Sequence, residues 1–334
     1  MPPITFVTVA WFLGRHLVPA LCRAGHVVRV LVRNPAAHPW LARCPQVEII
    51  HADILDADRV TEAVTGCTYV VHAGGLFRFW GKREAFERTN AGGTANVLKA
   101  AAQTPLKKLI YVSTIAVVGS PDPNRIVDEE HPLHPADAYQ WSKYHAEQEV
   151  MEAFRRDGVP VVIVRPGAYY GPLGTYAFNR LFFRDPMRGI IMQINGGSYV
   201  TFPVYIGDVP QAILRAFECG HDGEIYNVCG DSLTHRAAFD IICEEGGIRY
   251  PRLNVPGWAG IGMARVLTAL GELIGREPFY PITLRSYVYN YWNVSSEKAR
   301  RELGFVPTDF REGARRTLAW YRAGQPDTVS EIEC

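Results

Sequence analysis

The strongest constraint on the fold is an alternation, up to about residue 170, of short apolar runs with segments of helix length. Strands that are apolar throughout and are joined by helices are buried on both faces, as in a parallel sheet. Repeated βα units cross over with the right hand, and they therefore predict a Rossmann-like, doubly wound α/β sheet. The apolar runs cover residues 4–9, 27–32, 47–50, 69–72, 108–113 and 159–164, and the candidate helices cover 12–24, 57–65, 84–103 and 138–157.

The second half of the chain is less regular. We interpret residues 1–170 as the Rossmann-like domain and 171–334 as mainly a smaller, mixed α/β substrate lobe, with segments near 201–230 returning to the sheet. Ligands of α/β proteins usually bind at the carboxyl ends of the parallel strands, so the site is expected in the cleft between the two parts. Helices are expected near 208–219, 235–246, 259–275, 296–303 and 309–322, and strands near 201–206 and 224–228.

Composition excludes several classes of function. With 35 Lys and Arg against 34 Asp and Glu, the chain lacks the basic excess of a nucleic-acid-binding protein. No apolar run reaches the roughly 18–20 residues that a membrane span needs, and the first expected strand leaves no room for a signal peptide. The seven cysteines form no CxxC pair and a proline interrupts the HxxH motif at 131–134, so no metal site is expected. We therefore expect a cytoplasmic protein whose partner is a small molecule.

Three polar features fall at the ends of predicted elements. In the YxxxK motif, the phenol of Tyr139 and the ammonium of Lys143 lie one helical turn apart on the same face. A nearby ammonium favours the phenolate, lowers the pKa of the tyrosine and makes it an acid/base group near neutral pH. Thr114 follows the strand 108–113 and offers a hydroxyl to a substrate carbonyl, and the turn-rich segment 165–172 follows the sixth strand.

The order and spacing of these features resemble the extended short-chain dehydrogenases/reductases. This superfamily holds NAD-dependent sugar-nucleotide epimerases and dehydratases, dihydroflavonol reductases and 3β-hydroxysteroid dehydrogenases. The resemblance covers nearly the whole chain and implies a Rossmann-like dinucleotide-binding domain with a substrate lobe. Besides the three polar features, the segments that carry it are Phe12-Leu13-Gly14-Arg15-His16-Leu17, Asp53-Ile54, Val70-Val71-His72-Ala73, residues 90–98, residues 223–228 and residues 296–305.

The resemblance also implies roles for single residues. Tyr139 would exchange a proton with a carbonyl or an alcohol, and Thr114 would hydrogen-bond the substrate oxygen. Lys143 would lower the pKa of Tyr139 and hold the nicotinamide ribose. Asp53 and Ile54 would flank the adenine. The other expected cofactor contacts are Trp11, Phe12, Leu13 and Gly14 in the first loop, His72, Ala73 and Gly74 after the fourth strand, and Pro166 and Tyr169 near the nicotinamide.

Arg33 bears on the choice of cofactor. It ends the second predicted strand, at the position where NAD-selective proteins usually place a carboxylate for the ribose 2′-hydroxyl. An arginine there favours a 2′-phosphate. We therefore predict that NADP(H) is preferred over NAD(H).

The first loop departs from the family pattern. Family members carry a GxxGxxG motif between the first strand and the first helix, and this chain has Thr8, Trp11 and Gly14 at those positions. A left-handed conformation at Thr8 would cost about 1–2 kcal/mol, and an indole at the helix N-terminus could fill the space of a pyrophosphate. Two readings stay open. Either the loop takes another path and still binds a dinucleotide, or Trp11 blocks the site and no cofactor binds.

Aromatic residues near the expected site favour an apolar or ring-shaped substrate. Arginines at 180, 184 and 188 could instead bind the diphosphate of a nucleotide sugar. The expected substrate contacts are Phe77, Phe79, Trp80, Tyr169 and Phe182.

Taken together, the residues favour an NADP(H)-dependent oxidoreductase that interconverts a carbonyl and a secondary alcohol. One alternative is a sugar-nucleotide epimerase or dehydratase. The other is a cofactor-free cyclase, lyase or isomerase on the same scaffold, in case Trp11 blocks the site. The resemblance also allows a homodimer formed through the segments 84–103 and 138–157.

Overall fold

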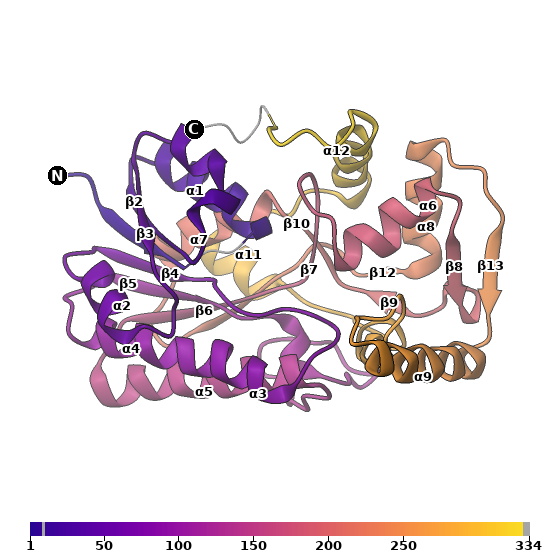
Figure 1. Cartoon of the computed structure of the whole chain (residues 1–334), viewed down its shortest axis with the longest axis horizontal. Helices are drawn as coiled ribbons and strands as arrows, with labels where there is room; N and C mark the ends of the chain where they lie inside the picture. Colours follow the sequence, from indigo (N-terminus) through magenta and orange to yellow (C-terminus); the bar gives the residue numbers. More distant parts are fainter. Residues whose placement is uncertain (9–10, 330–334) are drawn as a thin grey trace.

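A computed structural model of the chain describes residues 1–8 and 11–329. Its centre is a seven-stranded sheet in the order β11-β6-β5-β4-β1-β2-β3, and every pair of neighbours is parallel (Figure 1). This confirms the predicted Rossmann-like class. The strands are β1 (Ile4–Val7), β2 (Val27–Val32), β3 (Val47–His51), β4 (Tyr69–His72), β5 (Lys108–Val112), β6 (Val161–Pro166) and β11 (Ile225–Val228).

Both faces of the sheet are covered by helices, which explains why the strands are apolar throughout. In β6, for example, Val162 and Val164 pack into one hydrophobic cluster, whereas Val161 and Ile163 pack into another on the opposite face. One face is covered by α1 (Trp11–Arg23), α7 (Asp208–Cys219) and α11 (Glu297–Leu303), and the other by α2 (Ala57–Val64), α4 (Gly93–Ala102) and α5 (Ala138–Asp157) (Figure 1).

The strand order reverses between β1 and β4, because β2 and β3 lie to one side of β1 and β4, β5 and β6 to the other. Such a switch point opens a crevice at the carboxyl ends of the two strands, where α/β proteins bind ligands. Helix α5 begins beside this edge. Its N-cap Asp137 accepts a hydrogen bond from the Gln140 backbone N–H (2.9 Å), and its last turn closes on Gly158 in the left-handed conformation (φ 69°).

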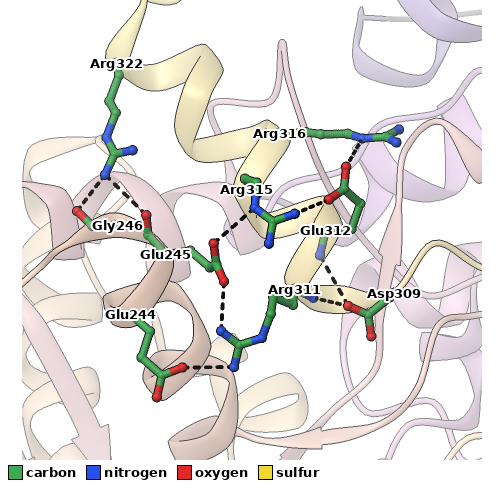
Figure 2. A network of polar contacts seen from close by, with 9 residues as sticks. All are labelled: Glu244, Glu245, Gly246, Asp309, Arg311, Glu312, Arg315, Arg316 and Arg322. Atoms are coloured by element: carbon green, nitrogen blue, oxygen red, sulfur yellow. Dashed lines mark hydrogen bonds and ion pairs between the residues drawn. The ribbon is translucent and has the colours of Figure 1, made fainter.

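In the second half of the chain, α7, β11 and α11 join the sheet layer, and most of the other elements lie beside it as a lobe. The lobe helices α8 (His235–Gly246) and α12 (Phe310–Arg322) are tied by ion pairs, among them Arg311 to Glu244 (2.9 Å) and Arg315 to Glu245 (3.2 Å) (Figure 2). The remaining strands are β7 (Ala168–Tyr170), β8 (Ile191–Ile194), β9 (Val200–Thr201), β10 (Pro203–Tyr205), β12 (Leu233–Thr234) and β13 (Arg252–Val255). The remaining α-helices are α3 (Arg83–Phe86), α6 (Asp185–Met187), α9 (Gly257–Ile274) and α10 (Arg285–Val288).

Several predicted bounds differ from the structure. The helix expected over 84–103 is interrupted by a π-helical turn at Glu87–Gly92, which directs the buried Asn90 toward the loop after β4. The strand expected over 159–164 begins two residues later, because Pro160 has no N–H for the ladder. The strand expected over 4–9 is seen over Ile4–Val7, and residues 9 and 10 lie outside the described residues. Among the described helices, none has the length and apolarity to cross a membrane.

Candidate active site

Thr114 and Tyr139 meet at the carboxyl end of the sheet. Thr114 lies two residues beyond the end of β5, and its hydroxyl accepts a hydrogen bond from the Ala116 backbone N–H (3.2 Å). Tyr139 lies in the first turn of α5, and the Thr114 hydroxyl hydrogen-bonds its phenol. The strand end and the helix start thus bring together two groups that are 25 positions apart in the chain.

Lys143 lies one turn further along α5 and is buried. Its ammonium donates a hydrogen bond to the Val112 carbonyl (2.8 Å) and stands 4.2 Å from the centre of the Tyr111 ring. Burial lowers the pKa of Lys143 to about 7, and the Glu147 carboxylate opposes this shift.

The pKa of Tyr139 is raised. Burial is the largest cause, the charge of Asp137 adds to it, and the hydrogen bond from Thr114 acts in the opposite direction. The prediction that Lys143 lowers this pKa is therefore wrong for this structure, because desolvation of the phenolate dominates and the ammonium is engaged with β5. A tyrosine in this state keeps its proton at neutral pH and can act as a proton donor.

Replacing Lys143 with methionine is expected to stabilise the fold by about 1–3 kcal/mol at pH 6.5, because a desolvated ammonium is removed while Glu147 keeps its partner Arg165. The folded pKa of Lys143 lies below its ordinary value, so the unfolded state binds more protons between about pH 7 and 10.5. The wild type therefore gains stability as the pH rises through this window, and the advantage of Lys143→Met fades.

Urea unfolding at pH 6.5 and pH 9.5 measures both effects. Replacing the exposed Lys99 with methionine is the matched control, which is expected to leave the pH dependence unchanged. A Lys143→Met protein that is less stable than wild type at pH 6.5 would contradict the expected cost of the buried ammonium.

Glu147 and Arg165 form a buried ion pair beneath the site. Arg165 donates two hydrogen bonds to the carboxylate (2.9 and 2.6 Å), and both side chains are almost fully inaccessible. The pair joins α5 to β6 and places the Glu147 carboxylate, paired with Arg165, one turn beyond Lys143. Our reading of the sequence missed it, although Tyr139, Lys143 and Glu147 recur at intervals of four residues, which places them on one helix face.

An aromatic wall covers Tyr139. Phe77 lies edge-on to the Tyr139 ring (4.8 Å between ring centres), Phe79 contacts Phe77 (5.2 Å), and Tyr176 and Tyr287 contact Phe79 (5.4 and 5.2 Å). Phe77 and Phe79 are predicted substrate residues, whereas Tyr176 and Tyr287 were missed because nothing local in the sequence places them near α5.

The other predicted substrate residues lie differently. Phe182 stacks between Phe178 (4.2 Å) and Phe239 (4.8 Å) in the core of the lobe, so its prediction as a substrate contact is wrong: its face is occupied by protein. Trp80 is half-buried, and the described residues give it no ring contact with the wall. Tyr169 is half-buried near Tyr139, and burial raises the pKa of its phenol.

A chain of hydrogen bonds fixes the two strand ends at the switch point. The Thr94 hydroxyl donates its proton to the Asn90 carbonyl (2.6 Å), so it must accept a hydrogen bond from the Nε2–H of His72 (2.8 Å). The other ring nitrogen of His72, Nδ1, then carries no proton and accepts a hydrogen bond from the Thr8 hydroxyl (2.7 Å). Thr8 in turn accepts from the Gly74 N–H (3.0 Å). The His72 side chain is thus structural, and burial lowers its pKa to about 3.

Acid is expected to destabilise the protein from about pH 6.5 downward. Burial lowers the pKa values of His16 and His235 to about 4 and that of His72 to about 3, so below pH 6.5 the unfolded state binds protons that the folded state excludes. Each group lowers the free energy of unfolding by at most about 1.4 kcal/mol per pH unit in this window. Thermal unfolding between pH 7.5 and 5 should show a shallower slope for His72→Gln, and an unchanged slope for the exposed control His134→Gln.

The first turn of α1 lies at the crevice and begins at Trp11. The Trp11 side chain is 65% exposed and packs edge-on against His38 (5.6 Å), so the indole points to the surface. Phe12 packs against Tyr169 (6.2 Å), and the Leu13 side chain lies in the core, so only its backbone faces a ligand. Thr8 is not among the described residues with positive φ, and the strain considered for it is absent.

Arg33 and Asp53 lie at the far end of the crevice. Arg33 follows β2 and is well exposed, and its guanidinium approaches the Asp53 carboxylate to 3.9 Å. Asp53 also accepts a hydrogen bond from the Leu55 N–H (3.0 Å). The Ile54 side chain is buried beneath Gly93, where a Cβ would come within 2.8 Å of it.

The residues of the crevice fit a dinucleotide. The first turn of α1 carries no acidic residue, and helix geometry leaves its first N–H groups without intrahelical acceptors, which suits a phosphate at the switch point. A Cβ at Gly74 would lie 2.5 Å from the Thr8 carbonyl oxygen, so this position needs glycine for the two strand ends to meet. The described residues hold no cluster of three metal-ligating side chains.

This fold and site define the class of protein. The chain belongs to the NAD-dependent epimerase/dehydratase family, whose model matches residues 9–229, and it is an enzyme of the extended short-chain dehydrogenase/reductase type.

The chain is similar in sequence to two curated proteins and in structure to a solved enzyme, among others. The chain is 31% identical to a 4-hydroxy-2-methyl-3-oxo-4-farnesyl-3,4-dihydroquinoline-1-oxide ketoreductase of Stigmatella aurantiaca, with 90% of this chain and 91% of the relative covered. It is 30% identical to human 3 beta-hydroxysteroid dehydrogenase type 7, with 93% of each covered. The structure of the dTDP-glucose 4,6-dehydratase DesIV from Streptomyces venezuelae, with NAD and TYD bound, superposes with a TM-score of 0.78 at 25% identity over 96% of this chain and 97% of that one.

Proposed function

We propose that the protein is an NADP(H)-dependent oxidoreductase that interconverts a carbonyl and a secondary alcohol on a largely apolar, ring-shaped small molecule. The observation that carries the proposal is the position of the Tyr139 phenol, which is hydrogen-bonded to Thr114 and covered by Phe77 of the aromatic wall. The ketoreductase and hydroxysteroid dehydrogenase named above support the same reaction class.

In the proposed reaction, each residue of the site has a separate role. A bound nicotinamide dinucleotide would supply or accept the hydride. The Thr114 and Tyr139 hydroxyls converge on one point and would hold the substrate oxygen there, where Tyr139 donates its proton during reduction and recovers it during oxidation. Lys143 keeps two N–H groups beyond its bond to Val112, and these would hold the nicotinamide ribose. The aromatic wall would exclude water from the reacting carbon.

A nucleotide-sugar substrate has less support. Arg180 and Arg184 both engage the buried Asp185 (3.8 and 3.3 Å), and Arg180 also donates to the Phe279 carbonyl. The single Asp185 carboxylate balances one of their two charges, but both guanidinium groups are already held by contacts within the lobe, so a diphosphate would have to compete with these contacts. A cofactor-free reaction has less support as well, because the Trp11 side chain is exposed and packs against His38 rather than into the interior.

Calorimetric titration with NADPH and NADH, after removal of co-purified nucleotide, tests the cofactor. Consumption of NADPH is then followed with a panel of cyclic apolar ketones and a panel of nucleotide-sugar ketones. We expect micromolar binding of NADPH, weaker binding of NADH and turnover of cyclic ketones. No binding of either nucleotide at millimolar concentration would refute the redox function, and turnover of nucleotide sugars alone would support the alternative.

A further inference from the structure

Helix α9 has the reverse of the usual polarity of a surface helix. Its inner face is built mainly from small residues: a Cβ added at Gly260 would lie 2.3 Å from the Tyr289 hydroxyl, and one added at Gly271 would lie 2.7 Å from the Arg276 carbonyl oxygen. Ala264, on the same face, is buried beside Phe79. The large apolar residues of a surface helix normally face the core. In α9, Leu267 packs into the core cluster, but most of the other large apolar residues face outward.

Helix α9 lies at the margin of the molecule (Figure 1), and several large apolar residues on its outer face are exposed. Their exposed fractions run from 51% at Leu270 to 83% at Leu273, and Trp258 at the start of the helix is 80% exposed. Apolar patches larger than a few hundred Å² are rare on soluble monomers and mark binding surfaces. The large residues of this face, the α9 outer face, are Trp258, Val266, Leu270, Leu273 and Ile274.

The charges around the α9 outer face favour an anionic partner. Arg265 lies on the face, and Arg276 and Arg285 follow α9 in the chain; all three are exposed and form no ion pair within residues 1–8 and 11–329. Glu272 is the exposed acidic residue on the same helix. A second copy of the chain would offer these three arginines only Glu272 as an acidic partner on the same helix. An anionic lipid surface would pair with them and also bury the apolar face, with tryptophan at the interface.

We propose that α9 docks the enzyme on the surface of an anionic lipid membrane, with its outer face among the headgroups and the upper acyl chains. The inner face of α9 contacts Phe79 of the aromatic wall, so docking would bring the entrance of the active site near the lipid. For an apolar substrate, a consequence that rests on the proposed function, the enzyme would then take its substrate from the membrane.

Flotation of the full-length protein with vesicles of phosphatidylcholine, with and without phosphatidylglycerol, tests the docking. The double variant Val266→Glu/Leu273→Glu is compared with Ile126→Glu/Val306→Glu, which places the same charges on exposed apolar residues elsewhere. We expect wild type and control to float with anionic vesicles, and the α9 variant to bind at least tenfold more weakly. Arg265→Gln and Arg276→Gln should each weaken binding roughly fivefold, the equivalent of about 1 kcal/mol per basic residue.

Three results would overturn the proposal: no flotation of wild type, equal losses in both double variants, or a wild-type dimer in sedimentation that the α9 variant dissociates while vesicles bind neither. Vesicle binding does not depend on the reaction, and turnover of a water-soluble ketone is measured separately. Failure of the docking and failure of the proposed chemistry are therefore distinguishable.

Discussion

Replacing Tyr139 with phenylalanine is expected to lower kcat for carbonyl reduction by about 10²–10⁴-fold, the usual contribution of a general acid. In the proposed mechanism the phenol is the proton donor, and burial, which raises its pKa, keeps it protonated at neutral pH. The ring itself is retained, so packing against Phe77 persists, and nucleotide affinity should change less than threefold. Steady-state kinetics and calorimetry with the same protein separate the two quantities.

Tyr144→Phe is the matched control, because Tyr144 lies on the same helix but packs against Trp141 and His145 rather than under the aromatic wall. It should retain full activity. Thr114→Val should lose less than Tyr139→Phe, since it removes one hydrogen bond to the substrate oxygen and leaves the proton donor in place. Equal activity of Tyr139→Phe and wild type would rule out this acid.

Replacing Arg33 with alanine is expected to weaken NADPH binding roughly 10–100-fold and to leave NADH binding almost unchanged. A hydrogen-bonded ion pair with the 2′-phosphate contributes about 1.5–3 kcal/mol, and NADH has no such group. The exposed position of Arg33 at the end of β2 leaves its guanidinium accessible. Calorimetric titration of each variant with both nucleotides gives the two affinities.

Asp53 provides the internal control for Arg33. Its carboxylate lies 3.9 Å from the guanidinium and competes with a 2′-phosphate. Asp53→Asn should therefore strengthen NADPH binding, or leave it unchanged, while Arg33→Ala weakens it. If Arg33→Ala weakened NADPH and NADH equally, the arginine would not read the 2′-phosphate, and the predicted preference for NADP(H) would fall.

Much of the site could be predicted because its parts are local patterns. The spacing of Tyr139 and Lys143 follows from helix geometry, and Thr114 follows from its place after an apolar strand. The aromatic wall was predicted only in part. Phe77 and Phe79 stand close after β4, whereas Tyr176 and Tyr287 reach them from the lobe through contacts that no sequence period reveals.

The pKa of Tyr139 likewise depended on tertiary contacts that the sequence pattern does not contain. The YxxxK spacing correctly placed the two groups on one face but predicted the wrong direction for the pKa of Tyr139, because burial outweighs the charge of a lysine that is bound to Val112. The prediction that Phe182 contacts the substrate was wrong for a related reason. An aromatic residue that is close to a site in sequence can instead be buried in the core of the lobe, as Phe182 is between Phe178 and Phe239.

By itself, the sequence determined the doubly wound sheet, the helix that carries Tyr139 and the family, because apolar periodicity, helix caps and motif spacing act over a few residues. Only the tertiary structure decided that Trp11 points outward, that Arg180 and Arg184 share Asp185, and that α9 turns most of its large apolar residues away from the core. Those outcomes depend on which distant surfaces meet, since exposure and ion pairing are properties of neighbours in space rather than in the chain.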